Sequence, residues 1–115
     1  SLMDEIEILP LFLFGQVSLV AVTVKLEEGK LKIGQPFAFT AVPIGVFGHK
    51  SIVSATLSPS LSSVAVPPLG SNNLTVEYIL YSPGFNIIEV EVFVIFFSSP
   101  VKYSYQIPVF ENGKR

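Results

Sequence analysis

LTVEYILYSPGFNIIEVEVFVIFF, residues 74–97, contains the clearest alternation of apolar and polar side chains in the chain. A period of two places one face of a segment in a core and the other in solvent, as in a half-buried β-strand. Ser-Pro-Gly-Phe-Asn, residues 82–86, separates the two alternating halves and is typical of a turn. We therefore predict a hairpin of two strands, with Glu77 across from Glu89 and Glu91 on one face.

The alternation breaks after Val92, because the positions that continue the glutamate face are large and apolar. The resulting apolar band lies at one end of the outer face of the predicted sheet, and such bands rarely stay exposed. It is covered either by residues 9–14 (LPLFLF) or 58–73 of the same chain, or by a second subunit or another protein. The candidate interface residues are Ile79, Tyr81, Ile87, Phe93, Ile95 and Phe97.

The rest of the chain shows the same period and no segment with a helical apolar stripe. Residues 58–73, rich in proline and serine, predict a crossover that changes sheets and includes a short edge strand at 63–66. About seven short strands separated by turns favour an all-β fold, an antiparallel two-sheet immunoglobulin-like β-sandwich. Further alternating segments are residues 20–26, 37–41, 52–57 and 101–107.

A chain of 115 residues fits one domain. We assign residues 17–110 to the sandwich and residues 111–115 to a polar C-terminal tail. In residues 1–16, Ser1 and Leu2 before Met3 look like a cloning scar, and the remainder is expected to form an apolar edge strand or a swapped strand. A signal or membrane anchor upstream is compatible with this sequence, whereas a native start at Met3 would favour the cytoplasm.

Composition excludes several classes of partner and cofactor. Only 14% of the residues are charged and the net charge is −2, so no basic stripe is available for nucleic acid or for an anionic membrane surface. Membrane association is therefore expected only through an anchor outside these residues. Cysteine is absent, which removes disulfides and thiolate metal sites. We expect no cofactor.

The residues that carry catalysis or bind metals are few. His49 is the single histidine and Asp4 the single aspartate, so a nucleophile, a base and an orienting group cannot be assembled, and we predict that the protein is not an enzyme. Glu77, Glu89 and Glu91 carry oxygen ligands for a hard cation, but a flat strand face surrounds an ion poorly. A solvated face is the preferred interpretation, and no metal site is predicted.

Two stretches resemble known modules. LKIGQPFAFT (31–40) resembles the entry to the second strand of extracellular immunoglobulin-like modules, and SPGFNIIEVEV (82–92) is similar to their turn between late strands. The cysteines and tryptophan of antibody domains are missing. The low charge and the Asn73-Leu74-Thr75 sequon resemble archaeal surface proteins from hot acidic habitats, of which the soluble domains of archaellum stator subunits F and G are one family. The resemblance implies an extracytoplasmic place on the cell surface, in a structural or motility assembly.

We therefore expect a non-catalytic extracytoplasmic module that contacts a protein partner, or a second copy of itself, through an apolar sheet face. The alternative is a module that binds a glycan or a small hydrophobic ligand through residues 44–50, where Phe47, His49 and Lys50 supply the contacts. Asn73 is the candidate glycosylation site, because its triplet matches the acceptor pattern for N-linked glycans.

Overall fold

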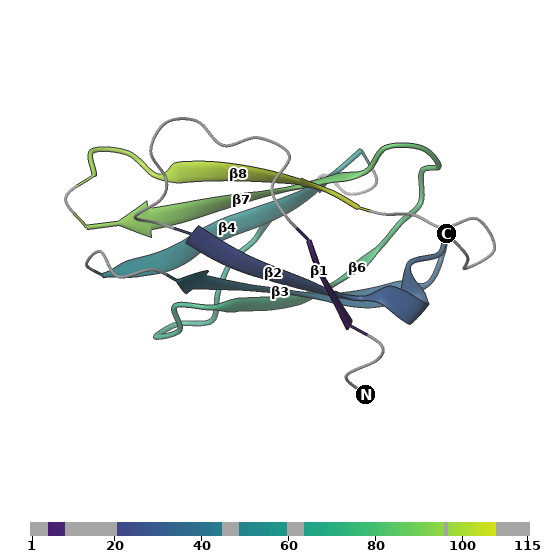
Figure 1. The fold of residues 1–115 in the computed structure, drawn as a ribbon, viewed down its shortest axis with the longest axis horizontal. Coiled ribbons are helices and arrows are strands. Elements are labelled where there is room, and N and C mark those ends of the chain that lie inside the picture. Colours follow the sequence, from purple (N-terminus) through teal and green to yellow (C-terminus); the bar gives the residue numbers. More distant parts are fainter. Residues whose placement is uncertain (1–4, 9–20, 45–48, 60–63, 96, 108–115) are drawn as a thin grey trace.

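A computed structural model describes residues 5–8, 21–44, 49–59, 64–95 and 97–107 (Figure 1). These residues form strands and one 3₁₀ turn, in agreement with the predicted all-β class. The elements in chain order are β1 (Glu5–Ile8), β2 (Ala21–Glu27), η3 (Glu28–Lys30), β3 (Pro36–Ile44), β4 (Lys50–Ser58), β5 (Val64–Ala65), β6 (Leu74–Ile79), β7 (Ile87–Val94) and β8 (Val101–Gln106).

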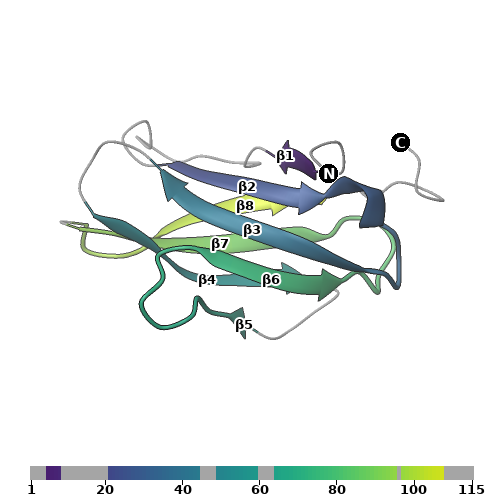
Figure 2. The ribbon, with the colours of Figure 1, turned by 90° about the horizontal axis from the view of Figure 1, so that it is seen from below.

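The strands form two four-stranded sheets that face each other. Sheet A has the order β1-β2-β3-β6 and sheet B the order β5-β4-β7-β8, with every neighbouring pair antiparallel (Figure 2). The chain crosses between the sheets after β3, β5 and β6, so β3 and β6 are neighbours in sheet A, while β4 and β7, which follow them along the chain, are neighbours in sheet B. This connectivity is that of an immunoglobulin-like sandwich, and the predicted fold class is confirmed.

The core contains the inward halves of the alternating strands. Val24 and Phe39 of sheet A and Val90 and Tyr105 of sheet B are all fully buried, with relative exposures of 0%. A β-bulge at Val53 in β4 shifts the register against β7, and it lets Ile52 and Ala55 both face the core. Burial of these side chains between the sheets stabilises the fold through the hydrophobic effect.

The predicted hairpin between β6 and β7 is wrong. β6 pairs with β3, whereas β7 pairs with β4 and β8. Residues 80–86 carry the chain across the core edge: Gly84 adopts a φ of 89°, and the buried Asn86 donates a 2.8 Å hydrogen bond from its carboxamide to the Ser82 carbonyl. Alternation identifies the inward face of a strand but not the sheet to which the strand belongs, which explains the error.

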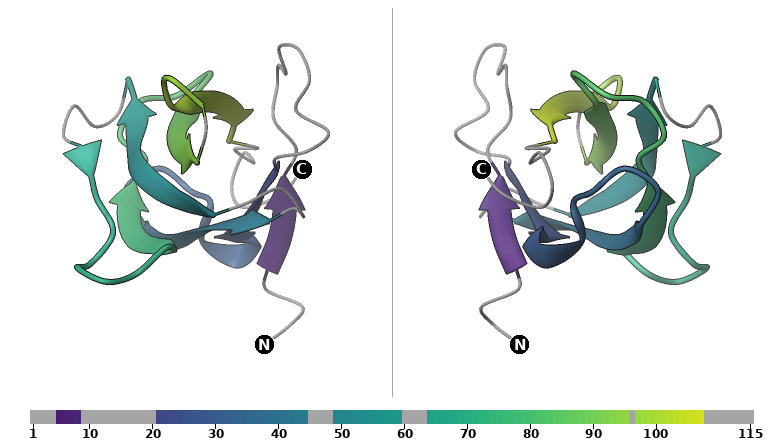
Figure 3. Two further views of the ribbon diagram at one scale, coloured as in Figure 1. Left: turned by 90° about the vertical axis from the view of Figure 1, so that its left-hand side faces the viewer. Right: turned by 90° about the vertical axis from the view of Figure 1, so that its right-hand side faces the viewer.

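The predicted crossover and edge strand are confirmed. β5 pairs with β4 through Ala65 opposite Ala55, at the edge of sheet B. The segment that follows stays near β4, because the Ile52 N–H donates a 2.9 Å hydrogen bond to the Asn72 carbonyl, and it then enters β6 in sheet A. β1 forms the far edge of sheet A beside β2, as the views along the long axis show (Figure 3).

Candidate interaction surface

The six predicted interface residues do not form one band. Phe93 and its neighbours Ile95 and Phe97 lie at the end of β7 in sheet B. Ile79 belongs to sheet A, where it is opposite Pro36, and Tyr81 follows it in the connection to β7 with 60% of its surface exposed. Ile87 begins β7, opposite Ser58 and Gln106, at the other end of that strand.

The end of β7 brings together His49 and Phe93, one from each of the two regions singled out in the sequence. The centroids of the His49 and Phe93 rings are 6.4 Å apart with an interplanar angle of 57°, and the Ile95 N–H donates a 2.9 Å hydrogen bond to the His49 carbonyl. Phe97 follows in a turn closed by a 3.1 Å hydrogen bond from its N–H to the Val94 carbonyl. We name His49, Phe93, Ile95 and Phe97 the aromatic end cluster.

The aromatic rings of the cluster are exposed and Ile95 is half-buried, although β7 itself is anchored in the core. Phe93 is 43% exposed and Phe97 is 39% exposed, while the intervening inward residue Val94 is buried. Ser51 lies directly opposite Phe93 on the neighbouring strand β4. The small side chain of Ser51 leaves the Phe93 ring accessible to solvent. Strand pairing fixes the position of this exposed apolar ring.

The middle of the same outer face is polar. Glu91 lies between Ser54 and Lys102 in the register, and its carboxylate is 3.6 Å from the Lys102 ammonium group. Glu89 occupies the next row, between Thr56 and Ser104. The break of alternation after Val92 therefore marks the boundary between a solvated sheet centre and an apolar sheet end.

The first and the last residues that the structure describes lie at the end of the sandwich opposite to the aromatic end cluster. Glu5, the first residue of β1, is opposite Glu27 where β2 ends, and Gln106 is opposite Ile87 where β7 begins. β7 runs from that end toward the aromatic end cluster, as its arrow shows in Figure 1. The cluster consequently lies far from both described chain ends.

The predicted carboxylate group on one face is also wrong. Glu77 is opposite Ala38 in sheet A, whereas Glu89 and Glu91 belong to sheet B. In the part of the chain that the structure describes, no three acidic or histidine side chains are grouped in a way that would hold a metal ion. Each of these glutamates instead lies on the outer side of its own sheet.

The alternative ligand site, residues 44–50, lies mostly outside the described residues. Phe47 and the rest of residues 45–48 are outside the described residues; His49 is exposed and Lys50 is half-buried. Two surface depressions of about 290 Å³ each are lined elsewhere: one by Glu27, Gly29, Lys30 and Gln35, and one by Glu5, Ile6, Glu7 and Lys25.

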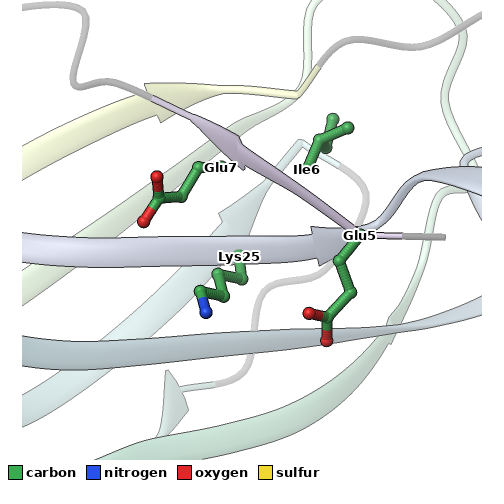
Figure 4. Close-up of a pocket in the computed structure, with 4 residues that line it drawn as sticks. All are labelled: Glu5, Ile6, Glu7 and Lys25. Atoms are coloured by element: carbon green, nitrogen blue, oxygen red, sulfur yellow. The ribbon is translucent and has the colours of Figure 1, made fainter. Parts of the chain in front are cut away.

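The second of these depressions is a charged strip along the β1 edge. Figure 4 shows the carboxylates of Glu5 and Glu7 and the ammonium group of Lys25 on one side of β1, with Ile6 directed to the other side. Pockets that bind small hydrophobic ligands are concave and mainly apolar. This depression does not have that character.

Neither protein-family models nor curated proteins nor solved structures gave a match to this chain. None of the helical segments in the described ranges is long and apolar enough to cross a membrane. Residues 9–14, one of the two predicted internal covers of the apolar face, lie outside the described residues, as do residues 60–63 of the other, the crossover at 58–73.

Proposed function

We propose that this chain is a non-catalytic interaction module whose aromatic end cluster docks against another protein, either a second copy or a different chain. The observation that carries the proposal is the exposure of Phe93 and Phe97 on a strand end anchored by Val92 and Val94, which are buried. Aromatic side chains fixed on a rigid element make effective interface anchors, because little conformational entropy is lost when they are covered.

The position of the aromatic end cluster supports the same function. Both described chain ends lie at the opposite end of the sandwich, so an attachment there would be distant from Phe93. Burial of apolar surface contributes about 25 cal/mol per Å², so a contact centred on two phenyl rings needs further apolar area from its surroundings. Ile44, which is 44% exposed and ends β3, is the last described residue before the segment that leads to His49.

The surroundings of His49 favour binding over catalysis. Its described neighbours are the ring of Phe93 and the backbone of Ile95, neither of which can orient an imidazole as a general base. The low charge and the resemblance to archaeal surface proteins support an extracytoplasmic location, with a role in a cell-surface or motility assembly.

Purification of the tagged protein from its own cells tests the proposal. We expect Phe93→Lys to remove the co-purifying partner, and Ser104→Lys, a matched charge on the same outer face but in its polar centre, to retain it. An untagged second copy, expressed from the same cells, distinguishes self-association from a different partner. Equal recovery of partners with both variants, each shown to be folded by circular dichroism, would contradict the proposal.

A further inference from the structure

The side-chain carboxamide of Asn73 is exposed to solvent. Its backbone is held by Ser71: the Asn73 N–H donates to the Ser71 hydroxyl oxygen at 3.1 Å, and that hydroxyl donates to the Asn73 carbonyl at 3.0 Å. The side chain itself is exposed and makes no hydrogen bond to the described part of the chain. Asn86 shows the contrasting case, since it is buried and its carboxamide donates to the Ser82 carbonyl.

The other two residues of the triplet, Leu74 and Thr75, hold Asn73 in this exposed position. Leu74 is the first residue of β6 and is only 2% exposed, so it anchors the start of β6 in the core. Thr75 is exposed on the outer face of sheet A, where its hydroxyl is 3.3 Å from that of Thr40. Asn73 and Thr75 therefore stand on either side of an inward residue, and both acceptor-motif side chains are accessible.

We infer that Asn73 is a site of N-linked glycosylation. The chemistry needs a lipid-phosphate-linked oligosaccharide as the sugar donor. The Asn73 Nδ2 atom attacks the anomeric carbon, an N–C bond forms, and the bond from that carbon to the phosphate oxygen breaks. The lipid phosphate leaves as an anion, Nδ2 releases one proton to a base of the transferase, and no oxidation or reduction takes place.

The position of Asn73 gives the glycan a physical role. β6 is the outermost strand of sheet A beside β3, and open strand edges promote unwanted pairing between chains. The preceding crossover exposes Val66 at 64% and Leu69 at 105%, so a hydrated glycan attached at its end would border apolar surface. This inference rests on the proposed extracytoplasmic location, because the acceptor triplet is used in secreted proteins, but it does not depend on the function of the aromatic end cluster.

Mass spectrometry of the protein isolated from its own cells tests the inference. Cleavage after glutamate yields a peptide that ends at Glu77 and contains the whole triplet. We expect a hexose-containing mass increment on that peptide in the wild type and in Asn72→Gln, the adjacent exposed asparagine outside the motif. Asn73→Gln and Thr75→Val should lose the increment entirely.

Thr40→Val is the control for Thr75→Val, because it removes the same threonine contact and leaves the triplet intact. It should retain the increment. The bare polypeptide mass in the wild type would overturn the inference, and so would an increment that persists in Asn73→Gln.

Discussion

The carboxylate of Glu27 accepts a 2.6 Å hydrogen bond from the backbone N–H of Ala38, where β2 stops pairing with β3. The last register pair of these strands is Leu26 opposite Phe39, so the glutamate oxygen takes the place of the next strand carbonyl. A side chain thus continues the ladder beyond the end of the strand. The partly buried Ala38 N–H would otherwise lose its partner.

Glu27→Ala should lower the free energy of unfolding by about 1–2 kcal/mol, because the Ala38 N–H loses a charged acceptor. Glu27→Gln keeps an oxygen at the same place and should cost less. Urea denaturation of both variants measures the difference. Equal stability of Glu27→Ala and the wild type would show that the hydrogen bond contributes nothing.

Gly84→Ala should destabilise the sandwich by about 1 kcal/mol or more, since Gly84 has a φ of 89°. A Cβ atom at Gly84 would meet no neighbouring atom within 4 Å, so the cost arises from the backbone alone. Gly29→Ala is the matched control, because a Cβ there is also unobstructed and its φ is not positive. Thermal unfolding should show a lower midpoint temperature for Gly84→Ala only. Similar midpoint temperatures for Gly84→Ala and Gly29→Ala would contradict backbone strain at position 84.

The free energy of unfolding should fall above pH 10. Burial raises the pKa of Tyr78 from 10.0 to about 12, and burial together with the neighbouring Tyr103 also raises the pKa of Tyr105. The unfolded chain therefore releases these protons first as the pH rises, and stability present below pH 10 is lost as the pH approaches the folded-state values. The loss at pH 11 should be about 1 kcal/mol from Tyr78.

Tyr78→Phe should reduce this alkaline decline, measured as the slope of the free energy of unfolding between pH 9 and about 11. A slope in Tyr78→Phe that equals the slope of the wild type would refute the link to Tyr78.

The sequence predicted the fold class because each strand carries its own inward face in its alternation. Val90 and Val92 could be assigned to the core from the period alone, and both are fully buried. The proline-rich crossover and the edge strand near Val64 were predicted for a similar reason, since proline and glycine punctuate the chain locally.

Pairing between strands could not be predicted in the same way. Whether Ile79 and Phe93 share a sheet depends on the path of residues 80–86, which is set by the left-handed Gly84 and the burial of Asn86. The contact between His49 and Phe93 depends on the register of β4 against β7, including the bulge at Val53. Neither the path of residues 80–86 nor the register of β4 against β7 produces a periodic pattern in the sequence.

The most direct test of the proposed function is site-specific photo-crosslinking in the protein's own cells. A photoreactive phenylalanine analogue at position 93 places the reactive group in the aromatic end cluster, and the same analogue at position 104 places it in the polar centre of the same face. We expect a discrete crosslinked species from position 93 only, whose mass identifies a second copy or another protein. Absence of a discrete species at position 93, or an equal yield at position 104, would contradict docking through the aromatic end cluster.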